Sequence, residues 1–187
     1  MSIEILEEKV KGFVYPDYGR VVRDGAAYVA TERFVRRGLK LCLMLYNKIE
    51  RLDQTARLIR DAIDFLLRRY HGYSVQGRIR AHYRDRSIEA NDKVDFEHVI
   101  PASVLTALLL QKRISVELAM NPPTCLLKKG DHRTLQKQGF GNRTPDVWWF
   151  WQRYNILEIK LETHDGTSVD PTTWNLGTHV IYFKILQ

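Results

Sequence analysis

The chain has 187 residues, of which 44% are hydrophobic and 27% charged, the composition of an ordinary globular protein long enough to bury one core. It has no apolar run of about 18 residues, and its first residues, MSIEILEEKVKG, lack the basic-then-apolar order of a signal peptide, so we expect neither a membrane helix nor a leader. The net charge of +7 favours a polyanionic partner such as nucleic acid, but charge alone does not identify one.

The two cysteines, Cys42 and Cys125, lie far apart in apolar surroundings. We expect them to be free thiols in a reducing cytoplasm rather than a disulfide. The absence of a CxxC pair argues against a structural zinc ribbon.

Residues 1–25 contain several glycines and a proline, and they predict a short strand or turn followed by a loop. From Ala26 to Tyr70 the pattern is helical, with Asp53 as a cap between two helices. The apolar residues at helical spacing are Phe34, Leu41, Leu45, Ile49 and Leu52, then Leu58, Ile59, Ala62, Ile63, Leu66 and Leu67.

The segment from Arg68 to Arg86 interleaves arginines with tyrosines. Guanidinium groups fit phosphate oxygens, and tyrosine rings stack on bases. We therefore predict that Arg78, Arg80 and Arg84 contact nucleic acid. The alternative is an ordinary solvated surface.

A strand, a helical insert, a second strand and a helix are predicted next. Residues 93–101, KVDFEHVIP, predict a strand stopped by Pro101. A helical insert follows over Ser103–Met120, and Thr124–Lys128 predicts the second strand. Gly130 breaks the chain, and Asp131 is expected to cap a helix that begins at His132.

The C-terminal part predicts an aromatic helix over 146–154 and two strands, at Ile156–Thr163 and His179–Leu186. A turn-rich stretch, Asp165–Gly177, separates the strands. The expected fold is α+β, with a mostly helical N-terminal region (1–90), a two-strand-and-helix core (91–145) and a small C-terminal β element (146–187), all in one compact unit.

The residues that carry chemistry lie between 95 and 142: the run DFEHVIP, then Asn121, then GDHR ending at Arg133. Phosphodiester hydrolysis needs a base for water and a cation to neutralise charge. His98 suits the base because the pKa of histidine lies near neutrality. A carboxylate and an imidazole together hold a divalent cation and leave positions open for phosphate and water.

This pattern resembles the HNH nucleases, whose ββα-metal core is a β-hairpin packed on a helix. The resemblance implies that His98 is the general base and that Asn121 orients it by a hydrogen bond. It implies that Glu97 and His132 bind the metal. The family more often has Asp at the position of Glu97, and the long insert between His98 and Asn121 is a second departure from its pattern.

Strand geometry leaves the ligand set open. Adjacent Glu97 and His98 point to opposite faces of a flat strand, so both reach one site only if the strand ends, bulges or twists there. Asp95 lies on the same face as Glu97 and is a rival ligand, and Asn142 is a further candidate. Arg133, beside the start of a helix, is placed to attract a phosphate.

The resemblance implies a metal-dependent endonuclease that hydrolyses nucleic acid, DNA in preference to RNA, with one divalent cation. Mg²⁺ is the first choice, and Mn²⁺, Ni²⁺ and Zn²⁺ are alternatives. Two other functions are compatible with the residues. One is a toxin nuclease neutralised by an immunity protein, because GDHRTLQKQG also resembles the last motif of bacterial HNH toxin domains. The other is a non-catalytic nucleic-acid-binding protein on the same scaffold.

Overall fold

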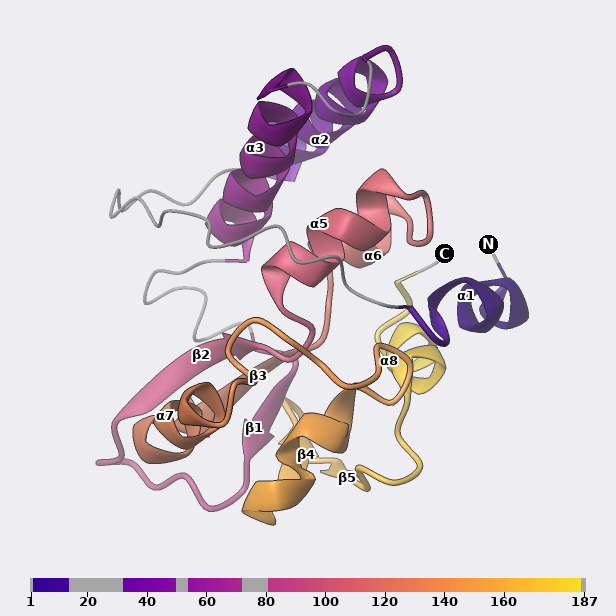
Figure 1. Cartoon of the computed structure of the whole chain (residues 1–187). Coiled ribbons are helices and arrows are strands. Elements are labelled where there is room, and N and C mark those ends of the chain that lie inside the picture. The colour runs from indigo at the N-terminus through magenta and orange to yellow at the C-terminus, as the bar shows by residue number, and fades with distance from the viewer. Residues whose placement is uncertain (1, 14–31, 50–53, 72–80, 186–187) are drawn as a thin grey trace.

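A computed structural model describes residues 2–13, 32–49, 54–71 and 81–185 of the chain (Figure 1). It is an α+β fold in which helices dominate the N-terminal half and a five-stranded mixed sheet organises the C-terminal part. The elements, in order, are α1 (Ile3–Val10), α2 (Glu32–Tyr46), α3 (Gln54–Tyr70), β1 (Tyr83–Asp85), β2 (Val94–His98), α5 (Ala102–Leu110), α6 (Val116–Met120), β3 (Thr124–Lys128), α7 (Lys129–Lys137), the 3-10 helix η1 (Phe150–Leu157), β4 (Leu161–Thr163), β5 (Ser168–Val169) and α8 (Leu176–Tyr182).

The helices α2 and α3 confirm the helical prediction for 26–70, although Asp53 and residues 26–31 lie outside the described ranges. They pack side by side through apolar stripes that include Val35 and Ile63, both fully buried. Gly38 permits their close approach, because a Cβ there would lie 2.8 Å from Leu66 Cδ1. Figure 1 shows this pair on the same side of the sheet as α5 and α6, with the C-terminal end of α3 directed toward β2.

The N-terminal strand or turn predicted within residues 1–25 is wrong for its described part. Residues 3–10 form α1, capped by the Ser2 side chain, which accepts a hydrogen bond from the Ile5 amide at 3.4 Å. The buried residues Leu6 and Val10 are four positions apart, which places them on one face of the helix. Residues 14–25 lie outside the described ranges.

The sheet has the strand order β2-β3-β1-β4-β5. The two predicted strands, β2 and β3, are confirmed and form an antiparallel pair with Glu97 opposite Cys125 and His98 opposite Thr124. The sequence did not predict β1, which lies parallel to β3 and antiparallel to β4. The predicted helical insert is also confirmed, as α5 and α6.

Two corrections concern the C-terminal part. The strand predicted at His179–Leu186 is wrong over its described residues, 179–185, which continue the helix α8 and end in a turn; the Asn175 side chain caps this helix by accepting from the Thr178 amide at 3.0 Å. The strand predicted at Ile156–Thr163 is confined to β4, since η1 occupies the positions up to Leu157. The aromatic segment begins with turns and becomes η1, with Trp151 and Phe150 fully buried.

The start of α7 also differs from the prediction. The helix begins at Lys129, so Gly130 and Asp131 lie inside its first turn rather than before it. Cys42 and Cys125 are free thiols, as expected, with Cys125 fully buried and Cys42 only partly so. Among the described helices, none has the length and apolar character needed to cross a bilayer.

Candidate active site

The motif residues lie on a hairpin followed at once by a helix. Strand β2 carries the acidic run and His98, β3 pairs with it, and α7 leaves the end of β3 and contacts both strands (Figure 1). The inward residues Cys125 and Leu127 of β3 are fully buried. This packing fixes the position of α7, and with it His132, relative to β2.

His132 is held by a carboxylate from β2. Its Nδ1 lies 3.0 Å from Asp95 Oδ2, and a carboxylate oxygen accepts, so Nδ1 carries the proton. The Gln136 side-chain nitrogen, a donor, lies 3.2 Å from His132 Nε2, which therefore carries the lone pair. A histidine whose Nδ1–H is bound by a carboxylate and whose Nε2 has a lone pair is typical of metal-binding histidines. The rival carboxylate identified in the sequence, Asp95, is thus the one that contacts His132.

Glu97 forms a buried ion pair with Arg153 from η1. Glu97 Oε1 lies 2.5 Å from Arg153 Nη2, and the two side chains are 6% and 1% exposed. Arg153 also donates to the backbone carbonyls of Val99, at 2.8 Å, and of Phe140. Burial raises the pKa of the Glu97 carboxyl, while the positive charge of Arg153 opposes that rise. Within the described part of the chain, Glu97 Oε2 makes no hydrogen bond of normal geometry.

His98 is paired with another histidine, on the other side of β2. Its Nε2 lies 2.7 Å from Nδ1 of His71, the residue after the end of α3, and both side chains are buried, at 6% and 8% exposure. The His98 ring also packs edge-on against Phe96, two residues earlier on the same face of the strand. No local pattern connects His71 with His98, because 27 residues separate them in the sequence.

Asn121 caps the C-terminus of α6 and makes its hydrogen bonds to Glu117 and His179. The side-chain nitrogen donates to the Glu117 carbonyl at 3.0 Å, and the Asn121 carbonyl lies 3.1 Å from His179 Nε2. Asn142 lies in the exposed turn after Gly141. The resemblance implies that Asn121 orients His98 by a hydrogen bond, but the residue that makes such a bond to the His98 ring here is His71.

The predicted residues fall into two groups, one on each face of β2. Asp95 and Glu97 point toward α7 and η1 with His132, while His98 points toward α3 with His71. This is the alternation expected of a regular strand, in which neighbouring side chains point to opposite faces. The structure brings His132 to Asp95, and it places His98 across the strand from them.

Two further histidines, which the sequence analysis did not assign to the site, lie beside the hairpin. His82 Nδ1 lies 3.0 Å from the Thr124 hydroxyl oxygen, opposite His98 in the hairpin. His179 Nδ1 lies 2.7 Å from the Tyr83 hydroxyl oxygen. These contacts tie the start of β1 and the helix α8 to the hairpin.

Acid should destabilise the fold through the buried histidines. Burial lowers the pKa of His71 to about 3 and that of His179 well below 6.5. Because the folded-state pKa lies below the unfolded value, the stabilising contribution is complete above pH 6.5 and is lost as the pH falls below it. Each histidine should cost about 1.4 kcal/mol per pH unit in that range. Urea unfolding at pH 7.5, 6.5 and 5.5 measures this; a free energy that is flat down to pH 5.5 contradicts the neutral, buried state.

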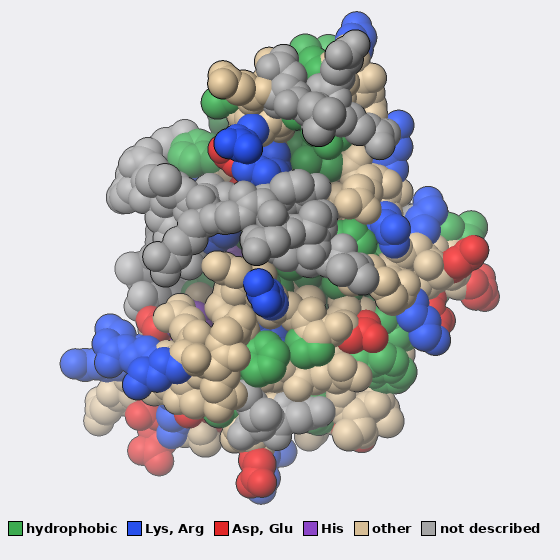
Figure 2. All heavy atoms as spheres, viewed as in Figure 1, with side chains coloured by type: hydrophobic (Ala, Val, Ile, Leu, Met, Phe, Trp, Pro, Cys, Tyr) green, Lys and Arg blue, Asp and Glu red, His purple; other side chains and the backbone are tan. Residues whose placement is uncertain are grey.

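The arginines predicted to bind nucleic acid have different environments. Arg78 and Arg80 lie outside the described residues. Arg84 Nε lies 3.1 Å from Glu162 Oε1, so its charge is partly compensated within the sheet. Arg133 is exposed on α7. Figure 2 shows Lys and Arg side chains gathered over the end of the molecule formed by α7 and the hairpin, where Lys129, Arg133 and Lys137 are exposed.

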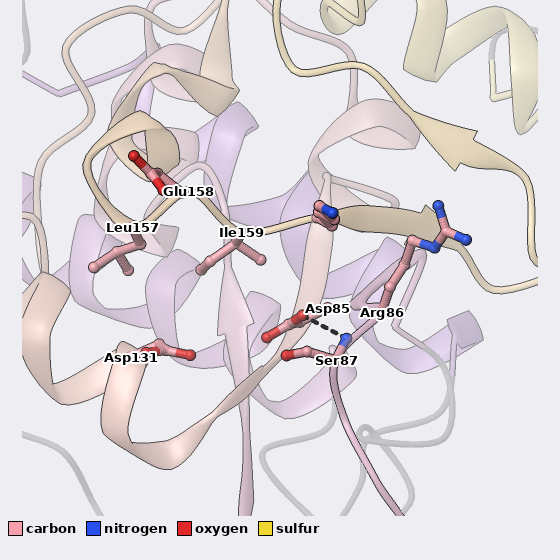
Figure 3. A pocket seen from close by; sticks show the side chains of 8 residues that line it. Asp85, Arg86, Ser87, Asp131, Leu157, Glu158 and Ile159 are labelled. Carbon is pink, nitrogen blue, oxygen red and sulfur yellow. Dashed lines mark hydrogen bonds between the residues drawn. The ribbon is translucent and has the colours of Figure 1, made fainter.

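A pocket of about 540 Å³ adjoins the first turn of α7 but contains none of the predicted site residues (Figure 3). The carboxylates of Asp85 and Asp131 point into it, opposite Leu157 and Ile159, and Asp85 accepts from the Ser87 amide at 2.8 Å. Partial burial and the nearby Asp85 charge raise the pKa of Asp131. Its lining has three carboxylates, of Asp85, Asp131 and Glu158, against the two cations Arg86 and Lys160, so this pocket suits a phosphate less well than the basic surface of α7 does.

No family model matches the chain, and no curated protein or solved structure matches it either. Within the described residues, no three or more His, Cys, Asp and Glu side chains are grouped as a metal site. The donor chemistry at His132 still fits one divalent cation in part: the Nε2 lone pair accepts from Gln136, which a cation would have to displace, Asp95 fixes the ring, and Glu97 is on the same face but engaged by Arg153.

Proposed function

We propose that this chain is a metal-dependent endonuclease of the HNH type, which hydrolyses nucleic-acid phosphodiester bonds, in DNA rather than RNA. One observation carries the proposal. The acidic run on β2 pairs with the second strand, β3, across the inserted helices, and the GDHR segment follows β3 as α7, where Asp95 holds His132 as the Nδ1–H tautomer. The basic surface over α7 supports a polyanionic substrate.

The residues have distinct roles in this proposal. His132 would hold the cation through Nε2 while Asp95 fixes its ring; Glu97 is the second ligand that the resemblance implies. A divalent cation there would neutralise charge on the phosphate. His98 would take a proton from the attacking water, and Arg133 would attract the phosphate.

The position of His98 favours a second candidate function. A base and a cation act on the same phosphate, yet the His98 ring and the His132 ring lie on opposite faces of β2. A protein that uses the hairpin and helix only to bind nucleic acid needs no such convergence. Loss of metal binding together with retained DNA binding would favour this non-catalytic function.

Nicking of supercoiled plasmid by the purified chain tests the proposed function. After EDTA treatment, the protein is assayed with Mg²⁺, Mn²⁺, Ni²⁺ or Zn²⁺ added singly. We expect nicking with at least one of these ions, Mg²⁺ first. His132→Ala, purified identically, is the matched control, since activity that persists in it comes from a contaminating nuclease or from a different site.

Chelation should stop nicking without unfolding the protein. Among the described residues, the core is built from apolar side chains of the helices and the sheet, and of the proposed ligands only Glu97, paired with Arg153, lies buried beside it. A weakly held cation contributes about 1 kcal/mol by linkage, which is a shift of about 2–4 °C in Tm at this chain length. A thermal melt and a nicking assay, each in EDTA and after Mg²⁺ is restored, measure this. Unfolding in EDTA would indicate a structural metal instead.

A further inference from the structure

We propose that His71 is a positioning residue for His98: it accepts a hydrogen bond from His98 Nε2–H and so leaves the lone pair of the His98 ring on Nδ1. The consequence for catalysis rests on the proposed function, whereas the tautomer follows from the hydrogen bonds alone. No motif in the sequence contains His71, and the contact arises where the end of α3 meets the end of β2.

The first step is the protonation of His71. Its Nε2 lies 3.0 Å from the carbonyl oxygen of Ala119 in α6, and a carbonyl oxygen only accepts. The proton of a neutral His71 is therefore on Nε2. The ring is buried, and burial lowers its pKa to about 3, so His71 is neutral at pH 7.

The second step determines which ring nitrogen of His98 carries the proton. A neutral His71 with its proton on Nε2 has a lone pair on Nδ1, so the nitrogen 2.7 Å away, His98 Nε2, must donate. The chain runs from His98 through His71 to the Ala119 carbonyl. A neutral His98 then has its lone pair on Nδ1, and a proton taken from water would go to that nitrogen.

This arrangement gives the insert between His98 and Asn121 a role. The insert folds as α5 and α6, and α6 brings the Ala119 carbonyl to His71. An insert, a helix end and a strand end thus jointly determine one tautomer. Asn121, two residues after Ala119, caps α6 and supports this placement indirectly.

Ring ¹⁵N NMR of histidine-labelled protein at pH 8 tests the proposal directly, with signals assigned by loss in His98→Gln and His132→Ala. We expect His98 to be protonated on Nε2, and His132, whose Nδ1–H binds Asp95, to show the opposite tautomer as an internal standard. A wild-type His98 protonated on Nδ1 would overturn the proposal. Because this measurement is made on the wild-type protein, it does not depend on whether a His71 variant folds.

Two substitutions of His71 complete the test. His71→Phe keeps a ring but removes the acceptor, whereas His71→Asn can place its side-chain oxygen near the former Nδ1. We expect His98 to lose its single tautomer in His71→Phe and regain it in His71→Asn. An unchanged tautomer in a folded His71→Phe would overturn the positioning role.

The same variants report on catalysis. We expect kcat for nicking to fall about 10- to 100-fold in His71→Phe, with little change in KM, and to recover in His71→Asn. A change in KM with kcat unaltered would contradict a positioning role for His71. If the wild type does not nick at all, the proposed nuclease function fails, while the tautomer measurements still decide the role of His71.

Discussion

His98→Ala should slow nicking by about 10²–10⁴-fold, the contribution of a general base, while DNA affinity stays within a few-fold of wild type. Affinity comes from the basic surface, to which a buried ring at 6% exposure adds little. The measurements are single-turnover nicking and a DNA titration at the same salt concentration.

His98→Gln is the matched control for this prediction. Truncation to Ala removes the donor to His71 and leaves a cavity, so it lowers stability as well as activity. Gln can keep an N–H near the former Nε2 but has no basic nitrogen. We expect His98→Gln to be as inactive as His98→Ala with a Tm nearer wild type. Wild-type nicking by His98→Gln would show that His98 is not the base.

Arg153→Met should destabilise the fold by about 3–5 kcal/mol, because it leaves the buried Glu97 carboxylate without its compensating charge. It also removes the donor to the Val99 and Phe140 carbonyls. Urea denaturation at pH 7 measures the loss. A loss below about 1 kcal/mol would mean that Glu97 readily becomes protonated or solvated.

The double variant Glu97→Leu/Arg153→Met separates the charge effect from the packing effect. Replacing both partners of a buried ion pair by apolar side chains is often neutral or stabilising, so the double variant should be more stable than Arg153→Met alone. The single variant Glu97→Gln then tests whether nicking requires the Glu97 carboxylate. If Glu97 acts only through Arg153, the nicking rate per folded molecule and its Mg²⁺ dependence should not change.

The elements with strong local patterns could be predicted from the sequence. The apolar stripes of α2 and α3, the strands β2 and β3, and the insert all follow from periodicity and from Pro101. The strand expected at His179–Leu186 was wrong because a short apolar run does not distinguish strand from helix. Here the cap at Asn175 favours the helix.

The candidate site was predicted only in part, for a physical reason. Alternation along β2 predicted that Asp95 and Glu97 share one face and that His98 points to the other, and these placements are confirmed. Whether Asp95 binds a metal stays a prediction. Arg153 and His71 were missed because they reach the strand from 56 and 27 residues away, through packing that leaves no local signal. Whether Asn121, Glu97 and His98 act as the resemblance implies stays a prediction.

The Mg²⁺ dependence of plasmid nicking, compared between wild type, Asp95→Asn and Glu97→Gln, tests the central claim most directly. Asp95 fixes the His132 ring, so Asp95→Asn should need about 10- to 100-fold more Mg²⁺ for half-maximal rate. Wild type should nick at low millimolar Mg²⁺, about the concentration at which weakly held catalytic cations bind. An inactive wild type across the metal series, or an Asp95→Asn curve that superimposes on it, would contradict the account.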